Sequence, residues 1–574
     1  MTEGRTRGIP AVAYFSMEVG FESTIPTYSG GLGVLAGDTL KAAADLSLPV
    51  TGVSLVHRKG YFRQMLAKSG AQTEEPDTWN PEEHLEAVEP TVSVVLEGRP
   101  VTVRAWRRRI GREDGGQIWL YLLDTDLDAN HADDRTLTDH LYGGDLGYRL
   151  KQEAVLGIGG VMLLRALGHD LRVCHMNEGH SALLALALLE GDMAAGMTQD
   201  EAIEEVRQRC VFTTHTPVPA GHDVFPLELV SEVLGDERVE RLRSAGCLHE
   251  ETLNMTHLGL QLSRYVNGVA MRHQQVSALM FPDYRIRSIT NGVHAPTWVA
   301  PSFAELYDRR IPEWRTDRFN FRYAIAIPRA EIKAAHDASK AELIAEVRQR
   351  AGVELAHDAF TIGFARRATA YKRATLLFTD LERLRRIARD VGPLQILYAG
   401  KAHPKDTGGK DLIKRIFAAA KTLGDDVRVV YLENYDMRLG GLLTAGVDVW
   451  LNTPQKPQEA SGTSGMKAAM NGVPSLSVLD GWWIEGHAEG VTGWSVGNGW
   501  RVDSDSALEA ESLYAKLETK LLPLYYQEPV EYLRVRRSAI ALNGSFFNAQ
   551  RMMLQYAAEA YGLGHALITQ PAAR

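Results

Sequence analysis

The chain has 574 residues, of which 45% are hydrophobic and 24% are charged, and its net charge is −9. This is the composition of a globular protein, and it excludes a disordered or collagen-like chain. The acidic excess argues against a protein that coats nucleic acid or an anionic membrane. Three widely spaced cysteines cannot form a disulfide framework, and they argue against a Cys-based zinc site, so we expect a reducing compartment.

The most apolar segments are 155–167 and 182–189. Neither approaches the roughly 20 residues that a membrane-spanning helix needs. The N-terminal residues contain no apolar run of the length found in signal peptides. We therefore predict a cytoplasmic protein that does not engage a membrane.

Strands, loops and helices alternate in the first half of the chain. We predict strands over 11–16, 171–176 and 210–214, a glycine loop at 29–33 before a helix ending near Asp45, and a long helix from about Ser181. Short β-prone runs at 92–96, 101–106 and 118–123 are separated by turns. They predict an antiparallel, β-rich insertion near 90–125.

The same alternation is clearer in the second half. Apolar runs predict strands at 360–365, 394–399, 427–432, 447–451 and 475–479. Helical patterns lie between them, from about 374 to 389 and from about 410 to 422, with short helices near Leu439 and at 466–471. The charged stretch 300–355 has no strand candidate and predicts a helical connection between two sheets.

Strands that alternate with helices predict a parallel, doubly wound α/β sheet. We therefore predict two such domains facing each other, over 1–315 and 316–574, with the last helices as candidates for packing back on the N-terminal domain. In these folds ligands bind at the carboxyl ends of the strands.

The segment from Glu459 to Lys467, EASGTSGMK, follows a predicted strand and opens a predicted helix. Its glycines allow tight turns, and backbone N–H groups at a helix start suit an anion. Lys467 would then lie about one turn into the helix, as a phosphate contact or as an amine that forms a Schiff base. A capped helix with an exposed lysine would give the same local pattern.

A second basic segment runs from Arg366 to Arg373 and follows a predicted buried strand. Cations at a strand's carboxyl end indicate an anion site, with arginine suited to bidentate phosphate contacts. A solvated helix start is the alternative, although cations there oppose the helix dipole. Histidines also cluster in 174–180 and 214–222, where we favour polar groups that line a sugar-sized cleft over a metal site.

Several segments together resemble one family of enzymes. EASGTSGMKAAMNG (459–472) is similar to the pyridoxal-phosphate lysine segment of the α-glucan phosphorylases of glycogen, starch and maltodextrin. ARRATAYKR (365–373) resembles their phosphate-binding segment. Segments such as SGGLGVLAGDTLKAAADLSLP, HMNEGHSAL, FTTHTPVPAGHD, ITNGVH and VYLENYD follow in the family's order, from about residue 11 to about residue 480.

The resemblance implies two Rossmann-like domains facing across a cleft, the GT-B arrangement, with the active site between them. It implies phosphorolysis of a terminal α-1,4-linked glucose by inorganic phosphate, releasing α-D-glucose 1-phosphate with retention. Lys467 would carry pyridoxal 5′-phosphate, whose 5′-phosphate acts as the acid/base partner of the substrate phosphate. Whether the protein is a homo-oligomer is left open.

The resemblance also assigns roles position by position. The catalytic group is Lys467, Arg367, Lys372 and His215. The cofactor site would be completed by Arg366, Lys372, Thr463, Gly465, Tyr435, Gly30 and Gly31. The glucosyl unit would contact Glu459, Ser461, Gly462, Asn291, His215 and Glu178.

The chain departs from the family pattern at several positions. Arg366 stands where many relatives have lysine, Thr369 where they have histidine, and Glu178 where they have aspartate. The sequence begins almost at the first predicted strand, with no counterpart of the regulatory N-terminal extension. We therefore expect neither a phosphorylation switch nor activation by AMP.

Two other functions remain open at this stage. A glycogen- or starch-synthase-like glucosyltransferase would use a nucleotide sugar and the same architecture, but it has no use for the amine of Lys467. An inactive glucan-binding protein is the third possibility. The cation set at 366–373 argues against it, because buried cations without an anion are costly.

Overall fold

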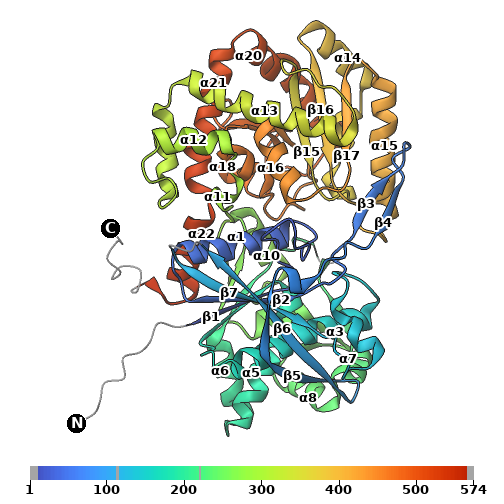
Figure 1. The fold of residues 1–574 in the computed structure, drawn as a ribbon, viewed down its shortest axis with the longest axis vertical. Coiled ribbons are helices and arrows are strands. Elements are labelled where there is room, and N and C mark those ends of the chain that lie inside the picture. Colours follow the sequence, from blue (N-terminus) through green and yellow to red (C-terminus); the bar gives the residue numbers. More distant parts are fainter. Residues whose placement is uncertain (1–10, 112–114, 219–220, 565–574) are drawn as a thin grey trace, which may run out of the picture.

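The computed structural model describes residues 11–111, 115–218 and 221–564. It consists of two α/β halves stacked one on the other, each built around a central sheet (Figure 1). The predicted fold class, two doubly wound α/β units, is confirmed. The domain division at 315/316 stays a proposal.

The first half contains a nine-stranded sheet in the order β14-β13-β9-β8-β1-β2-β7-β6-β5. Its strands from β14 to β7 are parallel, whereas β6 and β5 continue the sheet as an antiparallel edge. The bounds are β1 (Val12–Ser16), β2 (Val50–Leu55), β5 (Glu86–Leu96), β6 (Arg99–Gly111), β7 (Gln117–Asp124), β8 (Val173–Asn177), β9 (Cys210–Thr213), β13 (Tyr265–Gly268) and β14 (Ile286–Ser288).

Successive side chains of a strand point to opposite faces of the sheet, so those of β1 pack into two separate cores. Phe15 packs with helices such as α5 (Leu183–Ala194), and Tyr14 faces the core that contains α1 (Gly31–Asp45). The same second core contains Met552 and Met553 of α22 (Ala549–Gln555). The last helical segment that the structure describes, which includes α22, therefore lies against the first half (Figure 1).

Further helices cover the first sheet and its edges. They include α3 (Leu146–Ala154), α4 (Gly160–Ala166), α6 (Gln199–Arg209), α7 (Leu227–Leu234), α8 (Asp236–Ser244), α9 (Met255–Gln261), α10 (Met271–Met280) and α11 (Ala295–Trp298). The connection to the second half is helical, through α12 (Pro301–Arg310), η6 (Arg318–Ala326) and α13 (Arg329–Ala351).

The second half contains a six-stranded parallel sheet in the order β17-β16-β15-β18-β19-β20. Its strands are β15 (Phe360–Ala365), β16 (Leu394–Ala399), β17 (Arg428–Leu432), β18 (Val449–Asn452), β19 (Ser475–Val478) and β20 (Gly493–Val496). In order of appearance this is 3-2-1-4-5-6, the order of the Rossmann fold. The order of the strands across the sheet therefore reverses between β15 and β18.

The main helices of this half follow the strands in turn. They are α14 (Leu381–Asp390), α15 (Thr407–Leu423), α16 (Met437–Gly446), α17 (Ser464–Met470), α18 (Trp483–Gly486), α19 (Ser506–Lys516), α20 (Leu522–Tyr526) and α21 (Pro529–Ser538).

Three local predictions need correction. The predicted helix 374–389 is divided into η8 (Leu376–Phe378) and α14, because Asp380 caps α14 by accepting a hydrogen bond from the N–H of Arg383. The glycine loop is shorter than predicted, since α1 already begins at Gly31. The sixth strand, β20, was not predicted.

A hairpin of β3 (Arg63–Leu66) and β4 (Gln72–Glu75) extends from the first half onto the second and lies beside α15 (Figure 1). The amide of Gln64 donates to the carbonyl of Gly400, and the amide of Gln72 donates to that of Ala402, each at 2.9 Å. These buried hydrogen bonds join the two halves at one side of their junction.

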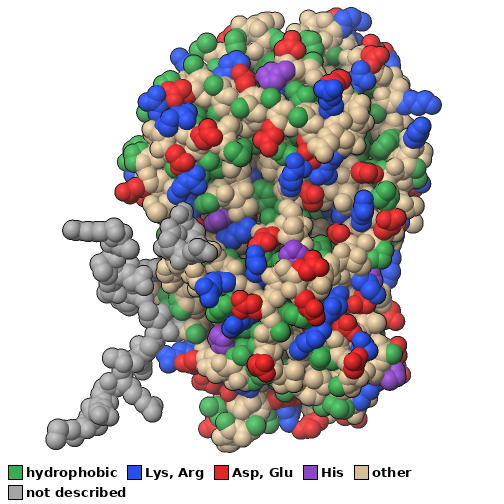
Figure 2. All heavy atoms as spheres, viewed as in Figure 1, with side chains coloured by type: hydrophobic (Ala, Val, Ile, Leu, Met, Phe, Trp, Pro, Cys, Tyr) green, Lys and Arg blue, Asp and Glu red, His purple; other side chains and the backbone are tan. Residues whose placement is uncertain are grey.

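Acidic and basic side chains are interspersed over the face drawn in Figure 2. Within the part of the chain that the structure describes, no helix combines the length and apolar character that crossing a membrane requires. All three cysteines are buried and unbridged.

Candidate active site between the two halves

The switch point of the second sheet gathers the predicted anion-binding residues. Arg366, Arg367 and Lys372 follow β15, and Glu459 follows β18. Because β15 and β18 are the neighbours between which the strand order reverses, their carboxyl ends open a crevice. The fold thus brings two segments almost a hundred residues apart to one place.

Glu459 is the centre of a buried ion cluster. Its carboxylate lies 2.5 Å from an Nη of Arg366 and 2.7 Å from Nζ of Lys372. These two cations hold the pKa of Glu459 at about 2, against the effect of burial. The other Nη of Arg366 is buried without a hydrogen-bond partner, so the cluster retains an unused donor.

Arg367 does not join this cluster but extends toward the first half. Its guanidinium donates to the hydroxyl of Ser29 at 3.1 Å, across the junction. A Cβ placed on Gly30 would lie 3.2 Å from the same guanidinium, so glycine leaves room for this approach. Gly31 has open space around its Cα, whereas the N–H of Gly30 already donates to Glu18.

Lys467 lies on α17, one turn after the Thr463 position that precedes the helix. Its side chain is buried, and Nζ lies 3.5 Å from the centroid of the Trp298 ring. Burial lowers the pKa of Lys467 to about 8, while the nearby charge of Asp38 opposes this shift and that of Lys41 adds to it. An amine with this pKa is partly neutral, and therefore nucleophilic, near neutral pH.

Two glycines shape the turn before α17 and the first turn of that helix. Gly462 has a φ of +86°, which side chains rarely adopt. A Cβ on Gly465 would lie 2.7 Å from the Trp482 ring. Ser461, in the same turn, has a buried hydroxyl without a hydrogen-bond partner in the described structure.

Three other predicted residues lie in the first half. The N–H of His215 donates to Glu178 at 2.7 Å, and its Nε2 lies 2.7 Å from the side-chain oxygen of Asn177. Burial lowers the pKa of His215 to about 4, so the ring is neutral at pH 7. Asn291 is also buried, and its side-chain oxygen has no hydrogen-bond partner in the described structure.

Glu178 has a φ of 77°, a strained conformation for a residue other than glycine. Its carboxylate accepts from the N–H groups of Gly179 and His215 and from the hydroxyl of Thr216. These bonds hold the loop after β8 in a fixed shape.

Tyr435 is half-buried before α16, with its hydroxyl directed at Gly440. Burial raises its pKa strongly, although the nearby positive charge of Arg366 opposes this. In the described structure Tyr435 is near Arg366 but makes no hydrogen bond to the Glu459 cluster.

Two further residues near the site, Glu18 and Asp480, were not predicted from sequence. Glu18 follows β1 and is buried, where it accepts from the N–H groups of Ser29 and Gly30 and from the hydroxyl of Tyr142. Asp480 follows β19 and accepts from the N–H of Glu459 at 2.9 Å. Both directly follow predicted strands, which is the signal that could have identified them.

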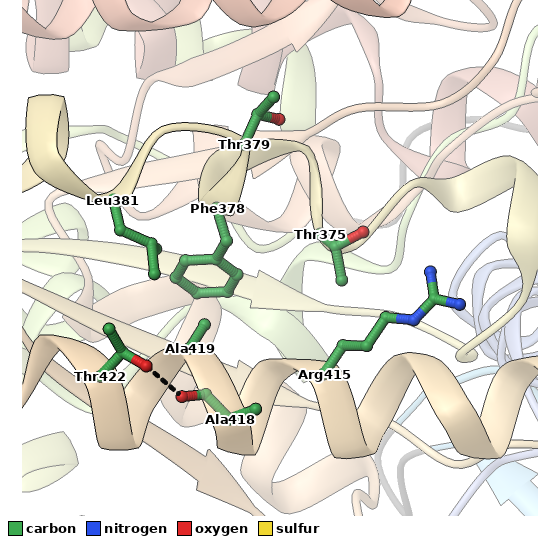
Figure 3. A pocket seen from close by; sticks show the side chains of 8 residues that line it. All are labelled: Thr375, Phe378, Thr379, Leu381, Arg415, Ala418, Ala419 and Thr422. Atoms are coloured by element: carbon green, nitrogen blue, oxygen red, sulfur yellow. Dashed lines mark hydrogen bonds between the residues drawn. The ribbon is translucent and has the colours of Figure 1, made fainter.

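Two surface hollows lie elsewhere. One, of about 440 Å³, is bounded by η8 and α15, with Phe378 and Arg415 among its lining side chains (Figure 3). The other, of about 520 Å³, includes Trp79 and Arg58. Neither is lined by a predicted site residue, so the candidate active site is defined by its buried polar groups rather than by these hollows.

Comparison with known proteins agrees with this geometry. The family model described as carbohydrate phosphorylase matches residues 22–114 and 165–519, which is more than half of the chain. The chain is 39% identical to a maltodextrin phosphorylase of Thermococcus litoralis, over 97% of this chain and 72% of that protein. It is 37% identical to a glycogen phosphorylase of Aquifex aeolicus, over 95% of this chain and 85% of that protein.

A glycogen phosphorylase of Mycobacterium tuberculosis is also 37% identical, over 96% of this chain and 70% of its own length. The chain therefore belongs to the carbohydrate phosphorylase family. The family resemblance predicted from its motifs is confirmed.

Proposed function

We propose that this protein cleaves the terminal α-1,4-linked glucose of a maltodextrin- or glycogen-type glucan with inorganic phosphate. The product is α-D-glucose 1-phosphate, formed with retention. The observation that carries the proposal is the buried cation cluster after β15, which pairs with Glu459 in the segment that leads into α17, where the buried Lys467 has a lowered pKa. Relatives named as maltodextrin and glycogen phosphorylases support the choice of substrate.

The residues present fit pyridoxal 5′-phosphate. Lys467 has the buried, partly neutral amine that attachment requires. The unpaired Nη of Arg366 offers a donor to a phosphate. Thr463, Gly465, Tyr435, Gly30 and Gly31 complete the proposed cofactor site, as the resemblance implies. When bound, the cofactor supplies a 5′-phosphate that exchanges a proton with the substrate phosphate.

The cations after β15 would stabilise two phosphates that lie close together. Two phosphates repel each other, and Arg366, Arg367 and Lys372 would offset that repulsion. Arg367, which is free of the Glu459 cluster and reaches toward Ser29, is our candidate for gripping the substrate phosphate. Its planar guanidinium suits two phosphate oxygens.

The sugar would be held mainly by polar groups with unused hydrogen-bond capacity. Ser461 and Asn291 each carry a buried, unpartnered oxygen, and the neutral His215 ring and the Glu178 carboxylate would add contacts from the first half. Glu459 and Gly462 complete the proposed glucosyl contacts. Positioning of phosphate against the glucosyl carbon, with water excluded, would account for most of the rate.

The direct test is incubation of the purified protein with maltodextrin and phosphate, followed by NMR. The proposal predicts phosphate-dependent release of the α-anomer of glucose 1-phosphate. Release of a β-anomer would contradict retention. Chain elongation from ADP-glucose without phosphorolysis would instead support the glucosyltransferase, and glucan binding without turnover would support an inactive binding protein.

We also propose that the protein works in the cytoplasm. Cys174 and Cys210 are paired in register on β8 and β9, and both are free thiols. Neighbouring free cysteines suit a reducing compartment. Measurement of the thiol state in the native source would test this.

A further inference from the structure

Trp298 connects an aspartate of the first half with the lysine of α17. The indole Nε1 donates to both carboxylate oxygens of Asp38, at 2.9 Å each. The face of the same ring lies 3.5 Å from Nζ of Lys467. The three side chains are all buried and come from α1, α11 and α17.

Asp38 is unusual as a buried carboxylate. A carboxylate has about four acceptor sites, and one N–H shared between two oxygens leaves most of them unused. Burial raises the pKa of Asp38, and the positive charges of Lys467, Lys41 and His294 oppose this shift. The charged form of Asp38 therefore depends on neighbouring cations more than on hydrogen bonds.

Lys41 lies one turn further along α1 and donates to the hydroxyl of Thr297 at 3.1 Å. The charge of Asp38 raises the pKa of Lys467, and the charge of Lys41 lowers it. His294, which precedes α11, is bonded to Asp45 and acts on Asp38. Among the described residues of the first half, Asp38 and Lys41 act on Lys467 directly, and His294 acts through Asp38.

The second half contributes little charge at Lys467. Of the elements packed against α17, η10 (Ala539–Gly544) carries no titratable side chain. On α16 the charged residue Arg438 is paired with Glu346 of α13. Apart from burial, the charges that shift the pKa of Lys467 among the described residues therefore come from α1.

We propose that Asp38 is a positioning residue for Lys467: its carboxylate fixes the Trp298 ring beneath the amine and, together with Lys41, sets the charge of the lysine nitrogen. This inference rests on the proposed function, in which Lys467 carries pyridoxal phosphate. A carboxylate that holds the indole N–H also keeps the ring face toward the cation, which stabilises the charged form. Lys41 and burial favour the neutral form.

The test uses absorption spectra of the cofactor-loaded protein over a range of pH. The violet band reports the protonated lysine–cofactor linkage, and the near-ultraviolet band its neutral form. Asp38→Asn retains an acceptor for the indole but removes the charge. We expect it to lower the pH midpoint between the bands by about one unit.

Lys41→Met removes the opposing charge and should move the midpoint upward, which keeps the inference testable if Asp38→Asn does not fold. Asp45→Asn is the matched control, because Asp45 lies on the same helix but pairs with His294 and Arg318. It should leave the midpoint within a few tenths of a unit. Equal midpoints in all four proteins, or equal shifts in Asp38→Asn and Asp45→Asn, would overturn the inference.

A second measurement separates this inference from the proposed function. Wild-type protein without a lysine-bound cofactor would refute the proposed function. The pH dependence of acetylation of Lys467, followed by peptide mapping, would then be compared in the same variants. A lower midpoint for Asp38→Asn and a higher one for Lys41→Met would still support the positioning role, and unchanged midpoints would refute it.

Discussion

Two buried ion clusters lie at opposite ends of β18 and are built from similar side chains. Asp448 precedes β18 and pairs with Lys340 and Arg536, each at 2.6 Å, and with His336. Glu459 follows β18 and pairs with Arg366 and Lys372. Both acids have pKa values held well below the ordinary range by their cations.

The clusters differ in what is left unpaired. None of the buried side-chain atoms of Asp448, Lys340, His336 and Arg536 lacks a hydrogen-bond partner. In the Glu459 cluster a buried Nη of Arg366 has none, and the nearby hydroxyl of Ser461 has none either. The Asp448 cluster, in which every buried polar side-chain atom has a partner, is closed and joins α13, α21 and the sheet. The Glu459 cluster, which has unpartnered atoms, is open and has capacity for a ligand. We infer that the closed cluster has a structural role and that the open cluster is available for binding an anion.

Lys467→Ala should have the largest effect, because it removes the proposed attachment atom while the rest of the open site remains. We expect loss of cofactor and of phosphorolysis in a protein that still unfolds cooperatively, at a temperature lowered by the loss of the bound cofactor. Spectra, a glucose 1-phosphate assay and thermal unfolding would measure this. Lys421→Ala, an exposed lysine on α15, is the control and should behave as wild type. Wild-type turnover by Lys467→Ala would refute the mechanism.

Asp448→Asn should be the most destabilising change in the closed cluster. It leaves Lys340 and Arg536 buried without their acid, which costs about 3–5 kcal/mol. Denaturant unfolding would show it as a lower midpoint. Asp425→Asn, in an exposed pair with Arg428, should change stability by less than about 1 kcal/mol. A similar small effect at Asp448 would mean that the closed cluster is not structural.

Glu459→Gln should distinguish the two clusters most sharply. It also unpairs two buried cations, but at a site where an anion can replace the lost carboxylate. We expect inorganic phosphate to raise the unfolding temperature of Glu459→Gln by several degrees and to have little effect on Asp448→Asn. Equal responses of the two variants would contradict an open anion site after β15.

Arg367→Ala should mainly weaken the use of phosphate. Loss of a charge-assisted contact of about 1.5–3 kcal/mol corresponds to a roughly 10- to 100-fold higher KM for phosphate. Steady-state kinetics at saturating glucan would measure this. Arg415→Ala, a cation outside the site, is the comparison. An unchanged phosphate dependence would remove Arg367 from the site.

Acid should produce the smallest effect. The pKa of Glu459 is lowered from 4.5 to about 2, so its stabilising contribution is complete above about pH 4.5 and is lost as pH falls toward 2. The stability difference between wild type and Glu459→Gln should therefore shrink from pH 5 to pH 3. Unfolding midpoints at both values would test this, and a constant difference would contradict the pairing.

Much of the second half could be predicted from sequence because its strands are short apolar runs between helical segments. β15 and β16 have the predicted limits. β20 was missed because Gly493–Val496 is short and flanked by glycines, which gives a weak pattern. The division of helix 374–389 depends on the cap at Asp380, a local signal that periodicity alone does not reveal.

The site was predictable where motifs are contiguous and not where contacts cross the junction. Arg366, Lys372, Glu459 and Lys467 come from two recognisable segments. The contact of Asp38 with Trp298 joins residues 260 positions apart, and nothing in either local sequence specifies it. The pairing of Arg366 with Glu459 likewise follows only from strand order.

The most direct test of the account is borohydride reduction of the purified protein followed by peptide mapping. The account predicts a visible or near-ultraviolet cofactor band that reduction converts into a stable adduct on the peptide containing Lys467. An unchanged protein spectrum, with no adduct on Lys467 even after pyridoxal phosphate is added, would contradict it.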